Sequence, residues 1–278
     1  MYAPEKLKKL WDIELDLADE MYRVCRENGL SVSAFYGTAL GAIRHNGFIP
    51  WDDDMDFAML REDYEKFIQI APAAIGPEYH LSHYSLEKGC PYYYVKLRRN
   101  GTVFLEEGME NVPIHHGVSI DIFPVDEAPE SAFGRFLYQT RANVCRELCI
   151  AKQLSVLTMK PFSRVVALAA GFVRKCTHLL ASLFSEEKLF RMQDRALRAK
   201  NGSGSSYLSY NGEGFIRTVD FAPFTEHLFE GRVYSVPANP DGILTDLYGD
   251  YMTLPPEEQR INHEPAVLIL DPEEETAS

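Results

Sequence analysis

The chain has 278 residues, of which 46% are hydrophobic and 25% are charged. This composition is typical of a folded globular protein and excludes disorder of the whole chain, while the length allows one large domain or two modest ones. Asp and Glu number 41 against 28 Lys and Arg, which gives a net charge of −13. A chain this acidic repels the phosphate backbone of nucleic acid, so we expect no nucleic acid partner.

The cysteines and the N-terminal residues predict the compartment. The five cysteines are an odd number without a C-x-x-C pair, which indicates neither a disulfide framework nor a zinc ribbon and favours the reducing cytoplasm. The N-terminus lacks the apolar stretch of a secretory signal peptide. The most apolar window, residues 165–184, contains Arg174, Lys175 and His178. Because charges are costly inside a bilayer, we expect a buried or interfacial helix there and no transmembrane span.

Hydrophobic periodicity predicts alternating helices and strands over the first half of the chain. We expect a helix over 5–28, a strand over 30–36, a helix from Gly37 to about Asn46, a strand over 55–60, and a helix over 61–70 that ends before Pro72. Further strands are expected at 92–97, 102–105 and 118–123, with Asn100-Gly101 as a hairpin turn between the first two.

The second half changes in character. Residues 130–200 contain long stretches of helix formers and no strand signal, residues 201–206 have the composition of a flexible hinge, and short apolar segments return at 224–228, 232–236 and 244–251. We therefore predict an α+β fold with a mixed sheet core and flanking helices. Its expected divisions are a core over 1–129, a helical insertion over 130–204, and a C-terminal segment over 205–278 that packs back on the core.

Acidic residues concentrate in one short segment that predicts a metal site. Asp54 and Asp56 are separated by one residue, and side chains at that spacing on a strand point to the same side, where both can reach one divalent ion. Asp121, expected on a neighbouring strand, is the candidate third ligand. Three carboxylates form a hard oxygen site that suits Mg²⁺, with Mn²⁺ as an alternative. For at least one of Asp52 and Asp53, a capping or supporting position is the better interpretation.

Gly37 and Thr38 begin a predicted helix and supply a candidate phosphate site, because a glycine at a helix N-terminus lets backbone N–H groups approach an anion. Arg44 lies on the same helix and can pair with phosphate through two hydrogen bonds, with His45 beside it. The alternative interpretation of Arg44 is a solvated charge.

Lys96 and Arg98 alternate along a predicted strand and therefore share one of its faces. In a chain with so large an excess of acid, such a basic pair is a second candidate for binding phosphate. The alternative, a solvated strand face, stays open at this point.

Three segments resemble one known family. The run F-Y-G-T-A-L-G-A-I-R-H-N-G-F-I-P-W-D-D-D-M-D-F over 35–57 resembles the signature of the LicD family of phosphocholine transferases, which belongs to the nucleotidyltransferase superfamily and has fukutin-type relatives. The segment I-D-I-F-P-V-D over 120–126 fits the same family, as does Y-G-D-Y-M-T-L-P-P over 248–256 with His263 after it.

The resemblance implies a nucleotidyltransferase-like core and a metal-dependent enzyme that moves phosphocholine from CDP-choline to a hydroxyl of a cell-surface glycan precursor, such as lipopolysaccharide or teichoic acid, and releases CMP. By the family pattern Asp54, Asp56 and Asp121 are the catalytic metal ligands. Such an enzyme is expected in the cytoplasm, with peripheral contact to the inner face of the membrane. Trp51 and the three tyrosines at 92–94 are candidates for an aromatic surface that binds quaternary ammonium, although aromatic residues are more often core.

Two other functions remain open from the sequence. The same carboxylates serve a nucleotidyltransferase that attacks the α-phosphate of an NTP and releases pyrophosphate. A non-catalytic protein that binds a glycan or nucleotide is a third class, and retention of all three aspartates argues against it. The residues do not distinguish choline from ethanolamine, ribitol or glycerol as the transferred group, and they do not identify the acceptor sugar.

Overall fold

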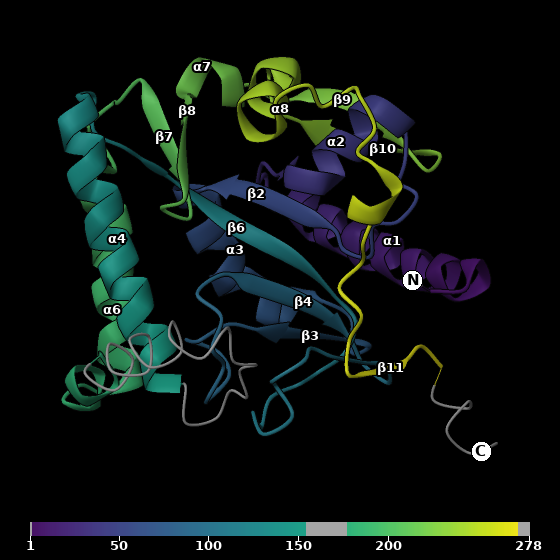
Figure 1. Cartoon of the computed structure of the whole chain (residues 1–278), viewed down its shortest axis with the longest axis horizontal. Coiled ribbons are helices and arrows are strands. Elements are labelled where there is room, and N and C mark those ends of the chain that lie inside the picture. Colours follow the sequence, from purple (N-terminus) through teal and green to yellow (C-terminus); the bar gives the residue numbers. More distant parts are fainter. Residues whose placement is uncertain (1, 154–176, 272–278) are drawn as a thin grey trace.

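The structure is a computed structural model that describes residues 2–153 and 177–271. A mixed sheet of seven strands forms its centre (Figure 1). Five strands follow the order β1-β2-β6-β4-β3, and β7 pairs with both β6 and β8. β2 and β6 run parallel, and their neighbours pair antiparallel. The strands of this sheet are β1 (Ser33–Ala34), β2 (Asp56–Leu60), β3 (Tyr79–Ser82), β4 (Val95–Arg99), β6 (Ser119–Glu127), β7 (Tyr207–Tyr210) and β8 (Gly214–Arg217).

Helices cover one face of this sheet and bury its apolar side chains. The helices of the first half of the chain are α1 (Pro4–Glu27), α2 (Tyr36–His45) and α3 (Arg61–Ala74). Leu10 and Leu17 of α1 are fully buried in one cluster with Phe57 of β2 and Ile122 of β6. Because strand side chains alternate, the residues next to these apolar ones point to the other face of the sheet. The apolar alternation thus turns Asp56 away from the core.

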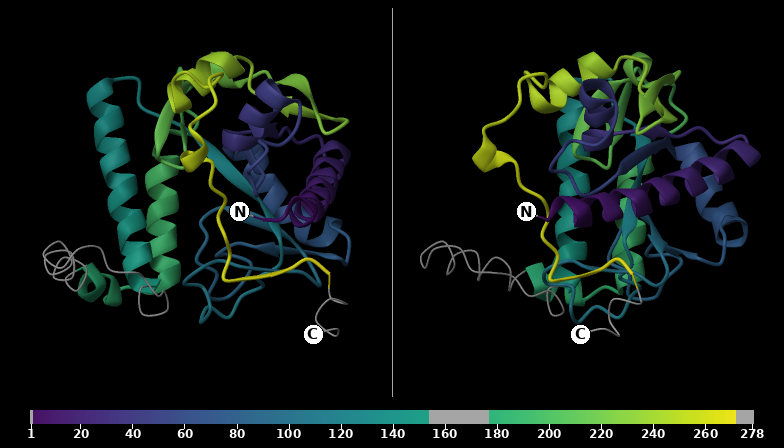
Figure 2. Two further views of the ribbon diagram at one scale, coloured as in Figure 1. Left: turned by 45° about the vertical axis from the view of Figure 1, so that its right-hand side comes forward. Right: turned by 90° about the vertical axis from the view of Figure 1, so that its right-hand side faces the viewer.

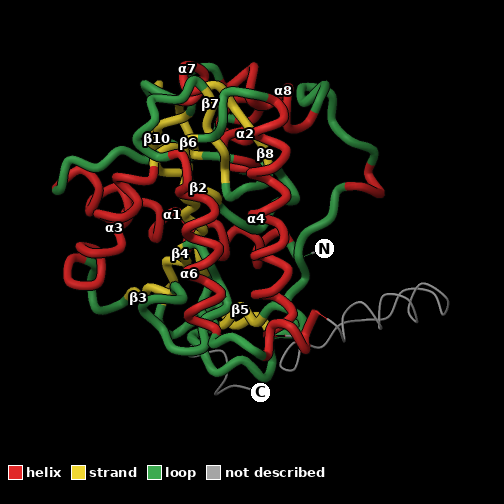
Figure 3. Tube along the Cα trace, turned by 90° about the vertical axis from the view of Figure 1, so that its left-hand side faces the viewer, coloured by secondary structure: helices red, strands yellow, loops and turns green. Residues whose placement is uncertain are grey.

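Two long helices stand side by side beside the sheet, α4 (Ala132–Gln153) and α6 (Glu186–Leu197), followed by the short 3-10 helix η1 (Arg198–Lys200) (Figure 3). The helical character predicted for 130–200 is confirmed for the described part of that range. Most of the apolar window at 165–184 lies outside the described residues. Within 2–153 and 177–271, the structure contains no helix with the length and apolar content needed to cross a membrane.

The C-terminal part of the chain returns to the first half. Its elements are α7 (Thr218–Phe221), β9 (Thr225–Phe229), β10 (Arg232–Val236), α8 (Pro240–Tyr248), η2 (Glu257–Gln259) and β11 (Val267–Ile269). The hairpin of β9 and β10 and the helix α8 pack around α2 and β1. After α8 the chain passes the sheet, as the yellow trace in Figure 2 shows, and its strand β11 pairs with β5 (Val103–Leu105).

The strand pairing around Asn100-Gly101 differs from the prediction. Gly101 does adopt a positive φ of 79°, but the turn does not join a hairpin. β4 pairs with β3 and β6, whereas β5 pairs with β11 from the C-terminus. The predicted hairpin was wrong because β3, a strand of four residues that the sequence pattern did not indicate, occupies the free edge of β4.

Three smaller expectations also change. The helix over 61–70 continues through Pro72 to Ala74, since a proline in the last turn removes only one hydrogen bond. The strand expected over 30–36 shrinks to the two residues of β1. The segment 201–206 is held in place, because Ser203 and Gly204 donate backbone hydrogen bonds to Glu127.

Candidate active site

A cavity of about 510 Å³ lies beside the beginnings of β2 and β6, and we call it the carboxylate cavity. Most of its polar lining is acidic, and Lys96 and His263 are the basic side chains in it. The lining residues are Glu14, Tyr36, Asp53, Asp54, Asp56, Tyr94, Lys96, Phe104, Glu106, Glu107, Val118, Ser119, Asp121, Phe123 and His263. All three aspartates that the sequence proposes as metal ligands are among them.

The register of three adjacent strands brings the central charges together. Asp56 of β2 lies opposite Asp121 of β6, and Asp121 lies opposite Lys96 of β4. Adjacent strands are about 4.8 Å apart, and directly paired residues project to the same face. Two carboxylates and one ammonium group therefore form a row across the sheet, with Asp54 two residues before Asp56.

Lys96 is buried and forms ion pairs with Asp121 and Glu106. Its Nζ lies 2.9 Å from Oδ1 of Asp121 and 3.3 Å from Oε1 of Glu106. Burial alone lowers the pKa of Lys96, but the neighbouring Asp121, Tyr94 and Glu106 outweigh it and hold the pKa well above its ordinary value. Lys96 is consequently a fixed positive charge at the centre of an acidic cavity.

Glu14 of α1 is a further carboxylate at the cavity, and it is only 1% exposed. Its Oε2 atom is buried and has no hydrogen-bond partner. Burial, followed by repulsion from Asp54 and Asp53, raises the pKa of Glu14 well above its usual value. A buried carboxylate with an unpartnered oxygen among other carboxylates is unfavourable unless a proton or cation neutralises it.

The other carboxylates repel one another in the same way. Burial and the neighbouring Asp54 and Asp121 raise the pKa of Asp56 well above its usual range. Burial raises the pKa of Asp54 as well, with further increases from Asp121 and Asp53 and opposing effects of His263 and Lys96. The pKa of Asp52 rises to about 8, again mainly through burial and then through Asp54 and Asp53.

The chemistry of this donor set fits a divalent cation, which would relieve the repulsion between the carboxylates. In the described ranges, no three Asp, Glu, His or Cys side chains are already gathered into a metal cluster. Mg²⁺ does not require one, since it is usually held by one or two carboxylates together with water and substrate phosphates. Asp54, Asp56 and Asp121 are the residues that would hold it.

Gly37 and Thr38 support the aspartate segment directly. The Thr38 hydroxyl accepts a hydrogen bond of 2.8 Å from the backbone N–H of Asp56 and so fixes the start of β2. A Cβ atom on Gly37 would lie 2.7 Å from Oδ2 of Asp52, so a larger residue would force the Asp52 carboxylate to shift. The predicted strand–Gly-Thr–helix arrangement is present, and these contacts show how it positions the aspartates.

Asp53 connects the aspartate segment to the C-terminal part of the chain. It is 2% exposed and accepts hydrogen bonds from the Tyr2 hydroxyl and from the backbone N–H and Nδ1 of His263, the last at 2.8 Å. The bond to Asp53, aided by the charges of Asp54 and Asp52, raises the pKa of His263 to about 9 against the effect of burial. Asp53 thus has the supporting position expected for one member of the run.

Three basic residues proposed to bind phosphate lie outside the cavity lining. Arg44 donates a hydrogen bond to His45 Nε2 and another to the backbone oxygen of Tyr251, which ties α2 to the segment after α8. Arg98 is buried and donates to the backbone oxygen of Gly117 at 2.7 Å. Of the basic candidates, Lys96 is the one that the structure brings to the carboxylates.

Several cavity residues were not predicted. Glu14 could have been found, because it follows Leu10 by four residues and precedes Leu17 by three, so it falls on the apolar face of α1. Tyr36 and Phe123 are inside the family-like segments but carry no signal of a binding role. The contact between Asp53 and His263 joins residues that are 210 positions apart, and no local pattern indicates it.

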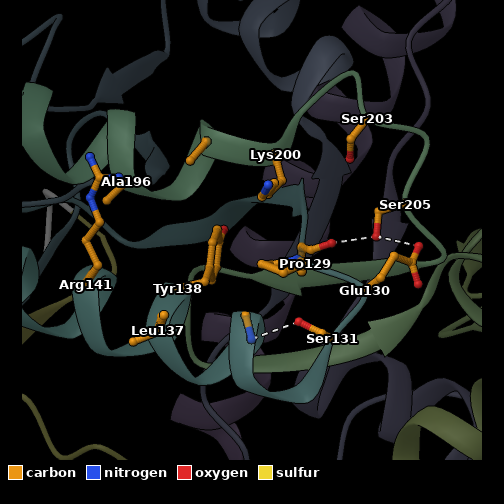
Figure 4. Close-up of a pocket in the computed structure, with 13 residues that line it drawn as sticks. Pro129, Glu130, Ser131, Leu137, Tyr138, Arg141, Ala196, Lys200, Ser203 and Ser205 are labelled. Carbon is orange, nitrogen blue, oxygen red and sulfur yellow. Dashed lines mark hydrogen bonds between the residues drawn. The ribbon is translucent and has the colours of Figure 1, made fainter.

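A second cavity, of about 600 Å³, lies between the start of α4 and the end of α6 with η1, and we call it the helical cavity (Figure 4). Two of its hydroxyl groups find partners within the chain: Ser205 donates to the backbone oxygen of Ala128 and to Glu130, and the Ser131 hydroxyl accepts from the backbone N–H of Gly134. The helical cavity is of similar size to the carboxylate cavity but holds no comparable set of converging carboxylates.

Comparison with known proteins agrees with this geometry. The family model described as "LicD/FKTN/FKRP, nucleotidyltransferase domain" matches residues 31–145, which include β2, β4 and β6. The chain is 28% identical over 265 residues to the lipopolysaccharide cholinephosphotransferase LicD of Haemophilus influenzae, and the match covers 90% of this chain and 92% of that protein. An uncharacterized protein of Rickettsia typhi is 36% identical over 67 residues, 24% of this chain and 22% of its own length. The matched range contains the paired strands of the carboxylate cavity, so the part of the chain that forms this cavity is similar to the nucleotidyltransferase domain of the LicD family.

Proposed function

We propose that this protein transfers phosphocholine from CDP-choline to a hydroxyl group of lipopolysaccharide or a related surface glycan precursor and releases CMP. The observation that carries the proposal is the row of Asp56, Asp121 and Lys96 across three strands inside one cavity. It supports phosphoryl transfer because it combines oxygen ligands for a divalent ion with a fixed cation for a phosphate oxygen. The similarity over most of both chains to a protein named lipopolysaccharide cholinephosphotransferase supports the transfer of phosphocholine to such a glycan.

In the proposed reaction an acceptor hydroxyl attacks the phosphorus that carries choline. A new P–O bond forms to the acceptor, the P–O bond to CMP breaks, and CMP leaves with the electron pair. The hydroxyl proton passes to Asp121 or a neighbouring carboxylate of the cavity. A divalent cation held by Asp54, Asp56 and Asp121 would supply charge neutralisation for the donor phosphates.

The chain's own residues contribute position and charge. Lys96 is held between Asp121 and Glu106, so it can pair with a phosphate oxygen without first being ordered. Thr38 fixes the backbone at Asp56, and Asp53 fixes the segment that carries His263 along the cavity wall. Phosphoryl transfer depends mostly on such positioning and charge stabilisation.

The test uses the purified full chain with Mg²⁺, CDP-choline and lipopolysaccharide that lacks phosphocholine. We expect release of CMP and appearance of phosphocholine on the glycan, with both lost when EDTA replaces Mg²⁺. The same assay with CTP should release no pyrophosphate. Pyrophosphate release from CTP without CMP release from CDP-choline would instead assign the site to nucleotidyl transfer.

A further inference from the structure

Three aromatic side chains form a continuous wall of the carboxylate cavity. Tyr36 begins α2, Tyr94 directly precedes β4, and Phe123 lies on β6. The ring centroids of Tyr36 and Phe123 are 5.6 Å apart with the rings edge to face, and those of Tyr94 and Phe123 are 4.5 Å apart. Segments that are distant in the sequence thus bring three rings to the same cavity as the aspartates.

The backbone of Tyr36 supports a specific role for its ring. Its φ of 41° lies in the left-handed region, which is unfavourable for a residue with a bulky side chain. The side chain is held there by edge-to-face contacts with Phe35, Phe123 and Tyr210 and by a hydrogen bond of 3.0 Å from its hydroxyl to Glu213. Such conformations are retained where the surroundings fix them, and they concentrate at functional sites.

The sheet register places the aromatic wall two residues along the strands from the row of Asp56, Asp121 and Lys96. Asp121 pairs with Asp56 and Lys96, and Phe123 follows two residues later on the same face of β6. Tyr94 stands two residues before Lys96 on the antiparallel neighbour, and its ring contacts Phe123. Two residues of strand span about 6.6 Å. The extended O–C–C–N tether between phosphorus and nitrogen in phosphocholine is somewhat shorter than this step, so both of its charged groups fit within the span from the row to the rings.

The cavity also favours a cation next to these rings. The ammonium group of Lys96 lies 5.6 Å from the ring centroid of Tyr94, so one ring of the wall already contacts a positive charge, and Asp121 and Glu106 balance that charge. The acidic lining adds attraction for a second one. Quaternary ammonium groups bind to such surfaces because they combine positive charge with apolar methyl groups that cannot donate hydrogen bonds.

We propose that Tyr36, Tyr94 and Phe123 bind the trimethylammonium group of the donor while its phosphate lies at the row of Asp56, Asp121 and Lys96. This assignment rests on the proposed transfer of phosphocholine and identifies what selects choline. Of the aromatic candidates in the sequence, Tyr94 lines the cavity, whereas Tyr93 hydrogen-bonds Arg61 and Asp194, and Trp51 packs against Arg260. An ethanolamine group has the same length but three N–H donors and no methyl groups, so the aromatic wall should bind it more weakly.

The direct test is binding of phosphocholine and phosphoethanolamine to the full chain with Mg²⁺, measured by isothermal titration calorimetry. We expect wild type to prefer phosphocholine, and Phe123→Leu to weaken phosphocholine binding about 10-fold while phosphoethanolamine binding changes less than about 2-fold. Tyr94→Leu should act in the same direction, and Tyr94→Phe, which keeps the ring, should restore the preference. Phe215→Leu is the control, since Phe215 packs in a separate cluster near the α4–α6 pair.

Several results would overturn the assignment. Equal weakening of both ligands by Phe123→Leu and Tyr94→Leu would indicate a general structural effect, and an unchanged preference would place choline elsewhere. If Phe123→Leu lowers the melting temperature so far that it cannot be assayed, Tyr36→Leu and Tyr94→Leu test the assignment. The quantity compared is then the ratio of their affinities for phosphocholine and phosphoethanolamine. The proposed function fails separately: wild type would then release no CMP from CDP-choline. CMP release with an unaltered choline preference in the variants rejects the aromatic assignment alone.

Discussion

The two cavities of this protein differ in how their polar groups are satisfied. In the helical cavity, Ser205 and Ser131 find partners within neighbouring loops and helices. In the carboxylate cavity, the buried Glu14 keeps an oxygen without a partner, and burial together with repulsion from neighbouring carboxylates raises the pKa of Asp56. Unfavourable burial of like charges is retained where a ligand relieves it, which is why we place the proposed function in the carboxylate cavity.

Removing a central carboxylate gives the strongest test of this difference. Asp56→Asn and Asp121→Asn should each lower CMP release from CDP-choline by about 10³-fold or more, because each removes charge from the proposed ion site. The measurement is steady-state turnover with Mg²⁺. Glu130→Gln changes a carboxylate of the helical cavity and should leave turnover within about 2-fold. Comparable losses in all three variants would contradict the distinction between the cavities.

Lys96→Met should have the second largest effect. Loss of the ammonium group removes the proposed phosphate contact and leaves Asp121 without its ion pair of 2.9 Å. We expect kcat/KM for CDP-choline to fall about 100-fold. Lys200→Met, at the helical cavity, provides the matched control and should be near neutral. If Lys96→Met retained wild-type kcat/KM, Lys96 would have only a structural role.

Glu14→Gln should stabilise the metal-free protein. The pKa of Glu14 is raised in the folded state, so its carboxyl group ionises at lower pH in the unfolded chain than in the folded protein. Ionisation therefore favours unfolding, and this loss of stability develops as the pH rises above the unfolded value of 4.5.

In EDTA, the melting temperature of Glu14→Gln should exceed that of wild type by about 2–4 °C at pH 8 and by less at pH 5. Mg²⁺ should reduce the difference, since it relieves the same repulsion in wild type. Glu130→Gln, whose carboxylate accepts hydrogen bonds from Ser206, should show no such gain. A lower melting temperature for Glu14→Gln in EDTA would mean that the carboxylate of Glu14 is satisfied in the folded protein.

The sequence predicted the site better where residues are close in the chain than where they are distant. The spacing of Asp54 and Asp56, and the later strand with Asp121, sufficed to place three carboxylates at one cavity. Local pattern also predicted the α+β class and most helices. It misplaced the pairing of β4, because strand partners depend on which distant segment competes for an edge. For the same reason it could not anticipate that His263 contacts Asp53.

The smallest expected effect concerns that contact. The pKa of His263 is raised to about 9 from an ordinary value of 6.5, so its charged form stabilises the folded state. This contribution is complete below about pH 6.5 and is lost as the pH rises through 9. Because the side chain of His263 is 65% exposed, solvent screening limits this contribution to about 1 kcal/mol, or about 2 °C in melting temperature.

In EDTA, His263→Gln should melt about 2 °C below wild type at pH 6 and equal it by about pH 10. In the background of Asp53→Asn, the substitution should lose most of this pH-dependence, since the hydrogen bond to Asp53 is the main cause of the raised pKa. A melting difference that is the same at every pH would show that His263 holds the C-terminal segment to the carboxylate cavity by packing alone, without a contribution from its charge.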